Sequence, residues 1–422
     1  MKEIMKIAVV GLGGRGCGLI KDAMLPAAEG YGIEIAAVLD NYEDRTAKGA
    51  DIVEEKTGKR PVEATNYQEI LENPDIDAVV ITAAWEAHIE LALASMKAGK
   101  YTAFEVGGAY TLEDCWRLVN TSEETGVPCM MLENCCYDKR ELMALKMVRE
   151  GLFGNIMHCS GGYCHDLRHE IAYGKENRHY RLRNYMNRNC ENYPTHELGP
   201  IAKLLDINNG NRMLSLTATA SGSKGLHDYI VAEKGADDPL ASVEFAQGDV
   251  FTTVIKCAKG QTIVLTLDTT LPRTYSRGFT VRGTKGAYFG ETDSIFLDSQ
   301  HREFEFNGKK IWGNASEFEA EHQHQLWKDY DPQGGHGGID YLEFCAFYEA
   351  LRAGCRPPID VYDAAAWMCI TALSEESILK GGAPVEIPDF TRGKWYMRTD
   401  INTDLKFNLD KADPFSDLYQ KK

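Results

Sequence analysis

A glycine-rich turn near the start of the chain has the residue types and spacing of a dinucleotide site. The sequence GLGGRG at residues 11–16 follows an apolar segment, 7–10, that is typical of a strand, and it precedes a segment that is typical of a helix. In this G-x-G-x-x-G pattern Gly11 permits the tight turn, Gly13 lets the backbone approach a pyrophosphate, and Gly16 allows close helix packing. The helix N-terminus favours the negative charge of the phosphates. We therefore expect a nicotinamide dinucleotide to bind at this turn.

An acidic residue after the next strand predicts which dinucleotide binds. Asp40 directly follows the predicted strand 33–39. At this position its carboxylate can accept hydrogen bonds from the adenine-ribose hydroxyls. The same carboxylate would repel a 2′-phosphate, so the sequence favours NAD over NADP. Arg45 is the nearby cation that could reverse this preference.

Two further strands end in residues that could line a ligand site. One is followed by Trp85-Glu86-Ala87-His88 and the other by Glu105-Val106. Ligands of open α/β sheets bind at the carboxyl ends of the strands, so we expect these residues near the cofactor. The alternative for His88, which begins a helix, is a capping or packing role with no ligand.

The elements that position these residues form a predicted Rossmann domain at residues 1–136. Short apolar runs alternate with helical periodicity there, as a doubly wound parallel α/β sheet requires. The expected strands are 7–10, 33–39, 78–82, 101–104 and 129–132, with a helix at 89–98.

A second domain, α+β with a large and mainly antiparallel sheet, is predicted at residues 137–422. A helix at 139–150 leads into strands expected at 217–222, 241–245, 251–257, 262–268, 278–283 and 286–289. Late helices at 339–353 and 361–379 would cover this sheet or pack back on the first domain. Residues 301–338 are polar and less regular, and we expect a long loop or lid there.

Composition narrows the range of partners and the compartment. Acidic residues outnumber basic ones 63 to 46, a net charge of −17, so a nucleic acid is not expected as a partner. No segment approaches the roughly 18 apolar residues of a membrane helix, and the chain enters a strand without room for a signal peptide. The 12 cysteines include no paired C-x-x-C motif, so we expect neither a zinc or other metal site nor disulfides. A cytoplasmic protein with reduced thiols, binding a small molecule and no membrane, is the prediction.

Five separated segments are similar to one known family. They are CMMLENCCYD (129–138), EGLFGNIMHCSGGYCHDLR (150–168), NYPTHELGPIAKLLD (192–206), LDTTLPRTYS (267–276) and VYDAAAW (361–367). Together with the Rossmann pattern they resemble glycoside hydrolase family 109, a branch of the Gfo/Idh/MocA oxidoreductases whose named activity is α-N-acetylgalactosaminidase. This resemblance implies NAD that stays bound and is recycled within each turnover.

The resemblance also implies the residues of the site. The NAD contacts that it implies are Gly14, Arg15, Asp40, Trp85 to His88, Glu105, Val106 and Asn134. The sugar contacts that it implies are Glu133, Tyr163, Arg181, Tyr193, His196 and Tyr275.

The chain departs from related patterns at two places. The Glu-Lys-Pro of many dehydrogenases in the wider family is Glu105-Val106-Gly107 here, so the lysine that serves their chemistry is missing. The usual Tyr-Pro-Thr-His-Gly-Leu-Gly-Pro of the glycosidase branch has Glu197 in place of its first glycine. This glutamate stands next to His196, and the sugar preference therefore does not follow from the resemblance.

The implied reaction is cleavage of small glycosides by oxidation at C3, elimination across C1 and C2, hydration and reduction. His196 suits the C3 hydroxyl proton because histidine titrates closest to neutral pH. Tyr163 is assigned to the C2 or glycosidic-oxygen proton, although its unperturbed pKa is about 10. Arg181, Tyr193 and Tyr275 would position hydroxyl groups.

Other interpretations of the same residues stay open. His196 could be a structural residue of a proline-containing turn, and the tyrosines could pack on a sheet face. His165, Asp166 and Arg168 are additional candidates for the site. The alternative functions are a net NAD-dependent sugar or inositol dehydrogenase and a non-catalytic NAD-binding sensor. A homo-oligomer, dimer or tetramer, is expected from the open face of the second sheet.

Overall fold

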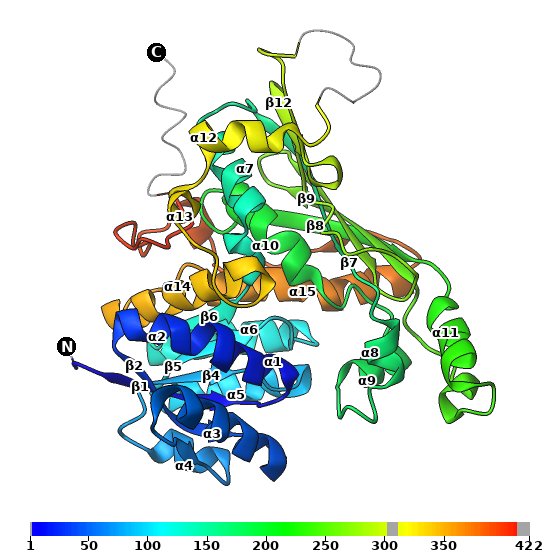
Figure 1. Ribbon diagram of the computed structural model, residues 1–422. Helices are drawn as coiled ribbons and strands as arrows, with labels where there is room; N and C mark the ends of the chain where they lie inside the picture. Colours follow the sequence, from blue (N-terminus) through cyan, green and yellow to red (C-terminus); the bar gives the residue numbers. More distant parts are fainter. Residues whose placement is uncertain (1, 302–310, 412–422) are drawn as a thin grey trace.

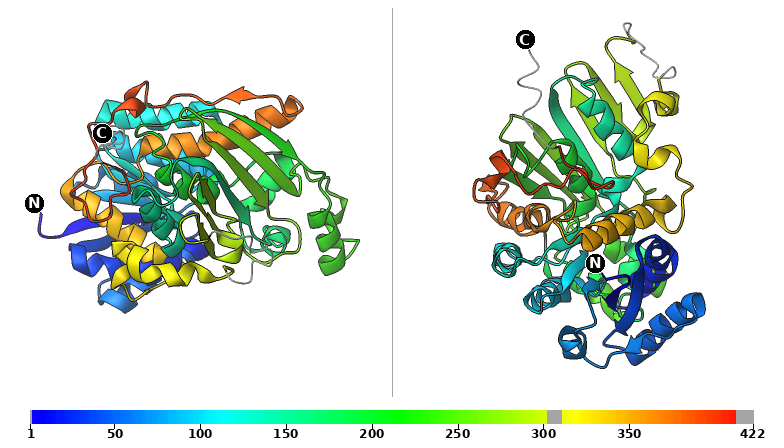
Figure 2. Two further views of the ribbon diagram at one scale, coloured as in Figure 1. Left: turned by 90° about the horizontal axis from the view of Figure 1, so that it is seen from above. Right: turned by 90° about the vertical axis from the view of Figure 1, so that its left-hand side faces the viewer.

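A computed structural model describes residues 2–301 and 311–411 of the chain. Figure 1 shows a sheet with flanking helices at one end of the molecule and a larger sheet at the other. Long helices lie between the two sheets, so the two halves of the chain share an extended interface (Figures 1 and 2).

The first sheet has six parallel strands in the order β3-β2-β1-β4-β5-β6, which is the Rossmann arrangement. Its strands are β1 (Met5–Val10), β2 (Ile33–Leu39), β3 (Val62–Glu63), β4 (Ala78–Ile81), β5 (Tyr101–Glu105) and β6 (Cys129–Leu132). Its helices are α1 (Gly14–Leu19), η1 (Ile20–Met24), α2 (Leu25–Tyr31), α3 (Glu43–Thr57), α4 (Tyr67–Glu72), α5 (Trp85–Lys97) and α6 (Leu112–Thr125). The neighbouring strands β4 and β5 are buried along their whole length, as expected for a parallel sheet covered on both faces. The predicted fold class is confirmed.

The second sheet has eight strands in the order β13-β12-β11-β7-β10-β9-β8-β14, and it is antiparallel except where β7 lies beside β10. Its strands are β7 (Ile156–Cys164), β8 (Met213–Ala220), β9 (Val250–Cys257), β10 (Thr262–Asp268), β11 (Thr280–Gly283), β12 (Gly286–Phe289), β13 (Ser294–Leu297) and β14 (Val385–Glu386). Side chains along β9 alternate between buried and exposed, so one face of the sheet packs on the core and the other is open.

The structure corrects two expectations for this sheet. Residues 241–245 are not a strand, because Asp238 caps a short helix η3 (Pro239–Ser242), on which no residue is buried. The sequence analysis also missed the short strands β13 and β14 and the long strand β7. Strand β7 pairs with both β10 and β11 near the middle of the sheet. Polar residues and the pair Gly161-Gly162 interrupt its apolar pattern, so periodicity does not identify it.

Two long helices connect the sheets. α15 (Val361–Leu379) packs on both β8 and α6, and α14 (Ile339–Ala353) packs on α2 and on η2 (Asn134–Tyr137). Both lie between the large sheet and the Rossmann half in Figure 1 and in the right-hand view of Figure 2. The predicted domain division at residues 136 and 137 falls inside η2 and stays a prediction.

The remaining helices are short or flank the second sheet. They are α7 (Lys139–Arg149), α8 (Arg168–Ala172), α9 (Arg181–Asn187), α10 (Pro194–Leu204), α11 (Gly225–Lys234), η4 (Gly290–Thr292), η5 (Asn314–Phe318), α12 (Glu319–His322), α13 (Gln325–Lys328), η6 (His336–Gly338) and η7 (Lys394–Tyr396). The region expected to be a loop or lid therefore contains four short helical segments in 311–338, and 302–310 lie outside the described residues.

In the described ranges, no helix is long and apolar enough to cross a membrane. All 12 cysteines are free thiols, and 11 of them are buried.

Candidate functional site

A cavity of about 1840 Å³ lies between the two sheets. Its walls include the turn after β1, the ends of β2, β4 and β5, and residues of β7, α9 and α10. Most of the predicted site residues line this cavity; those that do not are Gly16, Glu86, Glu133 and Tyr275, together with the additional candidates His165, Asp166 and Arg168. Residues from distant parts of the chain therefore meet in one place, as the sequence analysis predicted.

The glycine-rich turn has the shape that its sequence requires. A side chain on Gly11, whose φ is +100°, would place its Cβ 2.4 Å from the Ala83 nitrogen. A Cβ on Gly16 would lie 2.1 Å from the Gly11 oxygen, so Gly16 acts through helix packing rather than by lining the cavity. By contrast, the space beside Gly14 is open to at least 4 Å, which fits close approach of a pyrophosphate.

Asp40 stands at the end of β2 in a fixed orientation. Its carboxylate accepts hydrogen bonds from the Leu12 amide at 2.6 Å and the Tyr42 amide at 3.0 Å. Arg45 stacks on the Tyr42 ring at 4.9 Å and donates to the Asn177 carbonyl at 3.0 Å. The carboxylate is therefore held at the cavity wall, where it fits ribose hydroxyls and disfavours a 2′-phosphate.

Arg15 ties the glycine-rich turn to the second half of the chain. Its Nε donates to Glu105 at 2.7 Å, and its two terminal nitrogens donate to Asp340 of α14 at 2.8 and 3.0 Å. Asp340 also accepts from the Asn134 amide at 2.7 Å and pairs with His336 at 2.8 Å. Burial disfavours the charge of Asp340, but the hydrogen bonds from His336 and Arg15 hold its pKa well below the ordinary value. The sequence analysis missed Asp340 and His336, and no motif spacing points to them.

His88 and Trp85 lie on the first turn of α5. The two ring nitrogens of His88 lie 2.9 Å from the Ala83 oxygen and 3.1 Å from the Gly107 oxygen, and burial lowers the pKa of this histidine. Both nitrogens therefore face backbone carbonyl groups, and one of them can donate, which fits the packing role left open above. Trp85 is buried and its ring lies 5.5 Å from that of Tyr193, so it links the cofactor end of the cavity to the predicted sugar end.

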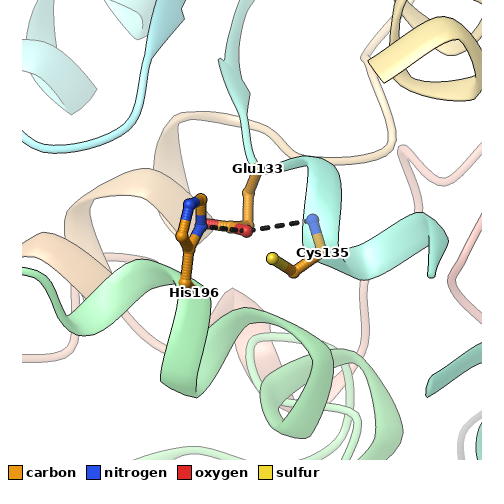
Figure 3. A group of neighbouring side chains, drawn as sticks. All are labelled: Glu133, Cys135 and His196. Atoms are coloured by element: carbon orange, nitrogen blue, oxygen red, sulfur yellow. Dashed lines mark hydrogen bonds and ion pairs between the residues drawn. The ribbon is translucent and has the colours of Figure 1, made fainter. Parts of the chain in front are cut away.

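A histidine–carboxylate pair lies at the sugar end. His196, in the first turn of α10, points its Nδ1 at Glu133, with distances of 2.7 and 2.8 Å to the two carboxylate oxygens (Figure 3). Glu133 is fully buried and also accepts from the Cys135 amide at 3.1 Å. Because a carboxylate only accepts, Nδ1 carries the proton and Nε2 is left as an acceptor. Glu133 thus stands behind His196 and orients it, which is why Glu133 does not line the cavity.

Tyrosine rings pack around this histidine. The Tyr163 ring, on β7, lies 4.3 Å from that of Tyr193 and 5.6 Å from that of His196. Its hydroxyl lies 3.0 Å from the Nδ1 of His165. Burial raises the pKa of Tyr163, while the positive charge of Arg181 opposes that shift. Burial also lowers the pKa of His165, so a neutral imidazole is available to accept the Tyr163 proton.

Arg181 lines the cavity and packs against aromatic rings. Its guanidinium lies over the Trp85 and Tyr193 rings at 5.1 and 4.9 Å, and its Nε lies 2.6 Å from Glu170 in an ion pair without hydrogen-bond alignment. Its buried Nη1 has no hydrogen-bond partner among the described residues. This nitrogen is enclosed by protein atoms, so leaving it without a partner has a cost in stability.

Tyr275 and Glu197 do not line the cavity, although the resemblance assigns Tyr275 and His196, the neighbour of Glu197, to the sugar site. Tyr275 is 49% exposed and lies beside the cavity, with its ring 6.3 Å from that of Tyr163, and burial of its hydroxyl raises its pKa to about 12. Glu197 is only 1% exposed, does not line the cavity, and forms a buried carboxyl pair with Glu191. The departure at Glu197 therefore puts no carboxylate in contact with the cavity.

Asp166 and Arg168 pair with each other at 2.6 Å and do not line the cavity.

The segment that contains α8 and α9 contacts the cofactor half of the molecule. Arg178 donates to both carboxylate oxygens of Asp44 at 3.0 and 2.7 Å, and so joins this segment to α3.

Comparison with known proteins agrees with this geometry. Residues 5–133 match the oxidoreductase family with an NAD-binding Rossmann fold, and residues 137–397 match the C-terminal domain of glycosyl hydrolase 109. The chain is 42% identical to an α-N-acetylgalactosaminidase of Tannerella forsythia over 79% of this chain and 74% of that protein. It is 37% identical to an α-N-acetylgalactosaminidase of Bacteroides fragilis over 93% of each.

A solved structure of similar fold is levoglucosan dehydrogenase in complex with NADH and levoglucosan. It has a TM-score of 0.64 and 17% sequence identity, and the match covers 91% of this chain and 99% of that one. Both family matches and the identity to curated relatives show that the chain belongs to glycoside hydrolase family 109, the NAD-dependent glycosidases of the Gfo/Idh/MocA oxidoreductases.

Proposed function

We propose that this NAD-dependent glycosidase cleaves small glycosides by oxidation at C3, elimination across C1 and C2, addition of water and reduction. The observation that carries the proposal is the pair of His196 and Glu133, which leaves Nε2 of His196 as a proton acceptor at the cavity. The same cavity contains the glycine-rich turn, so a sugar and a dinucleotide can lie side by side in it.

The cofactor-contacting residues fit NAD. The open space beside Gly14 accommodates a pyrophosphate, and the fixed carboxylate of Asp40 suits a ribose without a 2′-phosphate. When bound, NAD supplies the redox step by accepting a hydride from a substrate carbon and later returning it.

His196 is the proposed base for the C3 hydroxyl. As the C3 hydrogen leaves with its electron pair, the hydroxyl proton must leave too, and Nε2 is the acceptor that faces the cavity. Glu133 stabilises the imidazolium that forms, because its buried carboxylate lies 2.7 Å from Nδ1. His196 later returns the proton when the C3 carbonyl is reduced.

Tyr163 and His165 are the proposed route for the C2 proton. A C3 ketone acidifies C2–H, and loss of that proton lets the C1 substituent leave. Burial raises the pKa of Tyr163, so a free phenolate is disfavoured and its proton must move as the C2 proton arrives. The neutral His165 nitrogen, 3.0 Å from the Tyr163 hydroxyl, can take that proton. The proton relayed to His165 returns through Tyr163 to the departing oxygen, which is released as an alcohol.

The carboxylates near the predicted sugar end are not arranged as in an ordinary glycosidase, which uses two carboxyl groups for hydrolysis. Such enzymes need one acid and one base or nucleophile on the two sides of the glycosidic bond. Glu133 is fully buried behind His196, and Glu170 is paired with Arg181. Neither is a free carboxyl group facing the cavity, which favours the elimination route.

The first substrates to test are α-N-acetylgalactosaminides, because two relatives are named for that activity. In this proposal Arg181, Tyr193 and Tyr275 position the hydroxyl groups of the sugar. An acetamido oxygen is one group that could accept from Arg181.

The decisive experiment is hydrolysis of a chromogenic α-N-acetylgalactosaminide in D₂O. The elimination route predicts deuterium at C2 of the released sugar, which mass spectrometry and NMR would locate. A C2-deuterated substrate, run in H₂O, is the companion experiment because a shielded proton could return to its own carbon. Efficient hydrolysis with no C2 label, and no loss of deuterium from that substrate, would refute the proposal.

The same assay distinguishes the net sugar dehydrogenase and the NAD-binding sensor. Steady accumulation of NADH absorbance without release of the chromophore would indicate a dehydrogenase. No turnover across α- and β-linked glycosides of several sugars would indicate a sensor.

We also propose a homo-oligomer, a dimer or tetramer, that works in the cytoplasm. The open face of the second sheet, where Val254 is 41% exposed, supports self-association, and light scattering would measure it. The 12 free cysteines are typical of a reducing compartment.

A further inference from the structure

We infer that Glu133, Cys135 and His196 form a binding site for a zinc-like divalent metal ion, and that a metal bound there inhibits the enzyme. One donor atom from each side chain lies within 4.8 Å of the other two. The three side chains come from η2 and its preceding residue and from α10, so the spacing of cysteines along the chain does not reveal the site.

The donor set is chemically suited to zinc. Zinc binds thiolate, imidazole and carboxylate, and three protein ligands with an open fourth position are a recurrent arrangement. Metal–ligand bonds of about 2.0–2.3 Å put tetrahedral donor atoms roughly 3.4–3.6 Å apart. His196 Nδ1 and Glu133 Oε1 are 2.7 Å apart, and Figure 3 shows the Cys135 sulfur on the side that faces both of them. Small rotations of the three side chains would therefore bring them around one ion.

The surroundings allow an ion to enter and be held. His196 and the intervening residue Asn134 both line the cavity, whereas Glu133 and Cys135 are 0% and 2% exposed. An ion that enters past His196 would exchange its hydrating water molecules for buried protein ligands. These ligands include a carboxylate and a thiol that can ionise when the metal binds. Arg277 is the cation near Cys135, and it is already paired with Asp138 at 2.8 Å and Glu141 at 2.7 Å.

Inhibition follows from the tautomer of His196, and this part rests on the proposed function. Without metal, Nδ1 donates to Glu133 and Nε2 is free to accept the C3 proton. A neutral imidazole that binds metal through Nδ1 carries its proton on Nε2. His196 can then no longer act as the base. Glu133, now bound to the metal, can no longer orient His196 or stabilise its imidazolium.

The test uses purified holoenzyme with bound NAD, titrated with zinc chloride in a buffer that does not bind zinc. Calorimetry should give one ion per chain, and turnover of the chromogenic glycoside should fall in parallel. Cys135→Ala should weaken zinc binding and inhibition by about 10-fold or more. Cys136→Ala is the matched control, because it removes the adjacent buried thiol that is not part of the donor set.

Cobalt supplies a readout that does not depend on activity. Co²⁺ bound to a thiolate gives a charge-transfer band in the near ultraviolet, expected in wild type and Cys136→Ala and absent in Cys135→Ala. NAD content and thermal unfolding would show that each variant is folded, and Cys135→Ser replaces the alanine variant if it is not.

Equal zinc affinity in wild type and Cys135→Ala, or no thiolate band in wild type, would overturn the site. A Cys135-dependent band with full turnover at saturating metal would leave the metal site standing. That result would instead show that His196 is not the base. Failure of the metal site and failure of the proposed function therefore give different results.

Discussion

Arg15 of the glycine-rich turn donates two hydrogen bonds to Asp340 of α14, at 2.8 and 3.0 Å. The first half of the chain supplies the cofactor turn, and the second half supplies the carboxylate that fixes its arginine. Asn134, which also donates to Asp340, connects this contact to the turn that contains Glu133. Hydrogen bonds therefore connect the glycine-rich turn to the segment that contains Glu133, the partner of His196.

Asp340→Asn should weaken NAD binding without removing His196 or Tyr163. The substitution preserves the size of the side chain but removes the charge that holds Arg15, a charge-assisted contact typically worth about 1.5–3 kcal/mol. Titration of the cofactor-depleted variant with NAD measures the change. Asp331→Asn, at an exposed position, is the control, and equal NAD affinity in both variants would show that Asp340 does not organise the site.

His196→Ala should lower turnover by about 10²- to 10⁴-fold, the usual contribution of a positioned general base. NAD content should stay as in wild type, because His196 lies at the other end of the cavity from the glycine-rich turn. Steady-state kinetics with a chromogenic glycoside is the measurement. His227→Ala, on exposed α11, is the control, and near-normal turnover in a folded His196 variant would contradict the assignment.

Asp40→Ala should weaken NAD binding and reduce discrimination against NADP. The carboxylate that would repel a 2′-phosphate also accepts from the Leu12 amide at 2.6 Å, so its loss loosens the turn as well. Parallel titrations with the two cofactors give the ratio of affinities. Asp75→Ala, on the surface, is the comparison, and an unchanged ratio in Asp40→Ala would mean that Arg45 or another group sets the preference.

Glu197→Gln should make stability less sensitive to alkaline pH. Burial raises the pKa of Glu191 to about 8 and also raises that of its partner Glu197, so the folded protein holds protons that the unfolded chain releases at lower pH. Stability from this pair is complete below the ordinary glutamate pKa of about 4.5 and is lost as pH rises from there through the raised pKa values, about 8 for Glu191. Each such proton contributes a slope of up to about 1.4 kcal/mol per pH unit, and the variant has one fewer buried carboxyl group.

Unfolding in denaturant between pH 5 and pH 9 would measure this slope for both proteins. Glu376→Gln removes a partly exposed surface carboxylate and is the control. Parallel pH dependence in wild type and Glu197→Gln would show that the buried pair is ionised at neutral pH.

Much of the cofactor half follows from the sequence because its signals are local. Strand β1, the glycine-rich turn, the following helix and Asp40 are close together along the chain, and each glycine meets a steric need within that unit. Parallel strands read as buried apolar runs, so the six-stranded sheet was predictable apart from the short β3. The site residues identified by resemblance also converge on one cavity, although their roles stay proposals.

Other features depend on contacts between distant segments, which periodicity does not encode. Strand β7 was missed because a strand that contains Gly161 and Gly162 is stabilised by neighbours on both sides rather than by its own pattern. The direction of Glu197 was also undecided by sequence, since only the packing of α10 against β7 turns it into the interior. The sequence by itself determined the Rossmann fold and a preference for NAD. Tertiary structure decided that Glu133 orients His196, because a hydrogen bond of 2.7 Å requires two folded elements to meet.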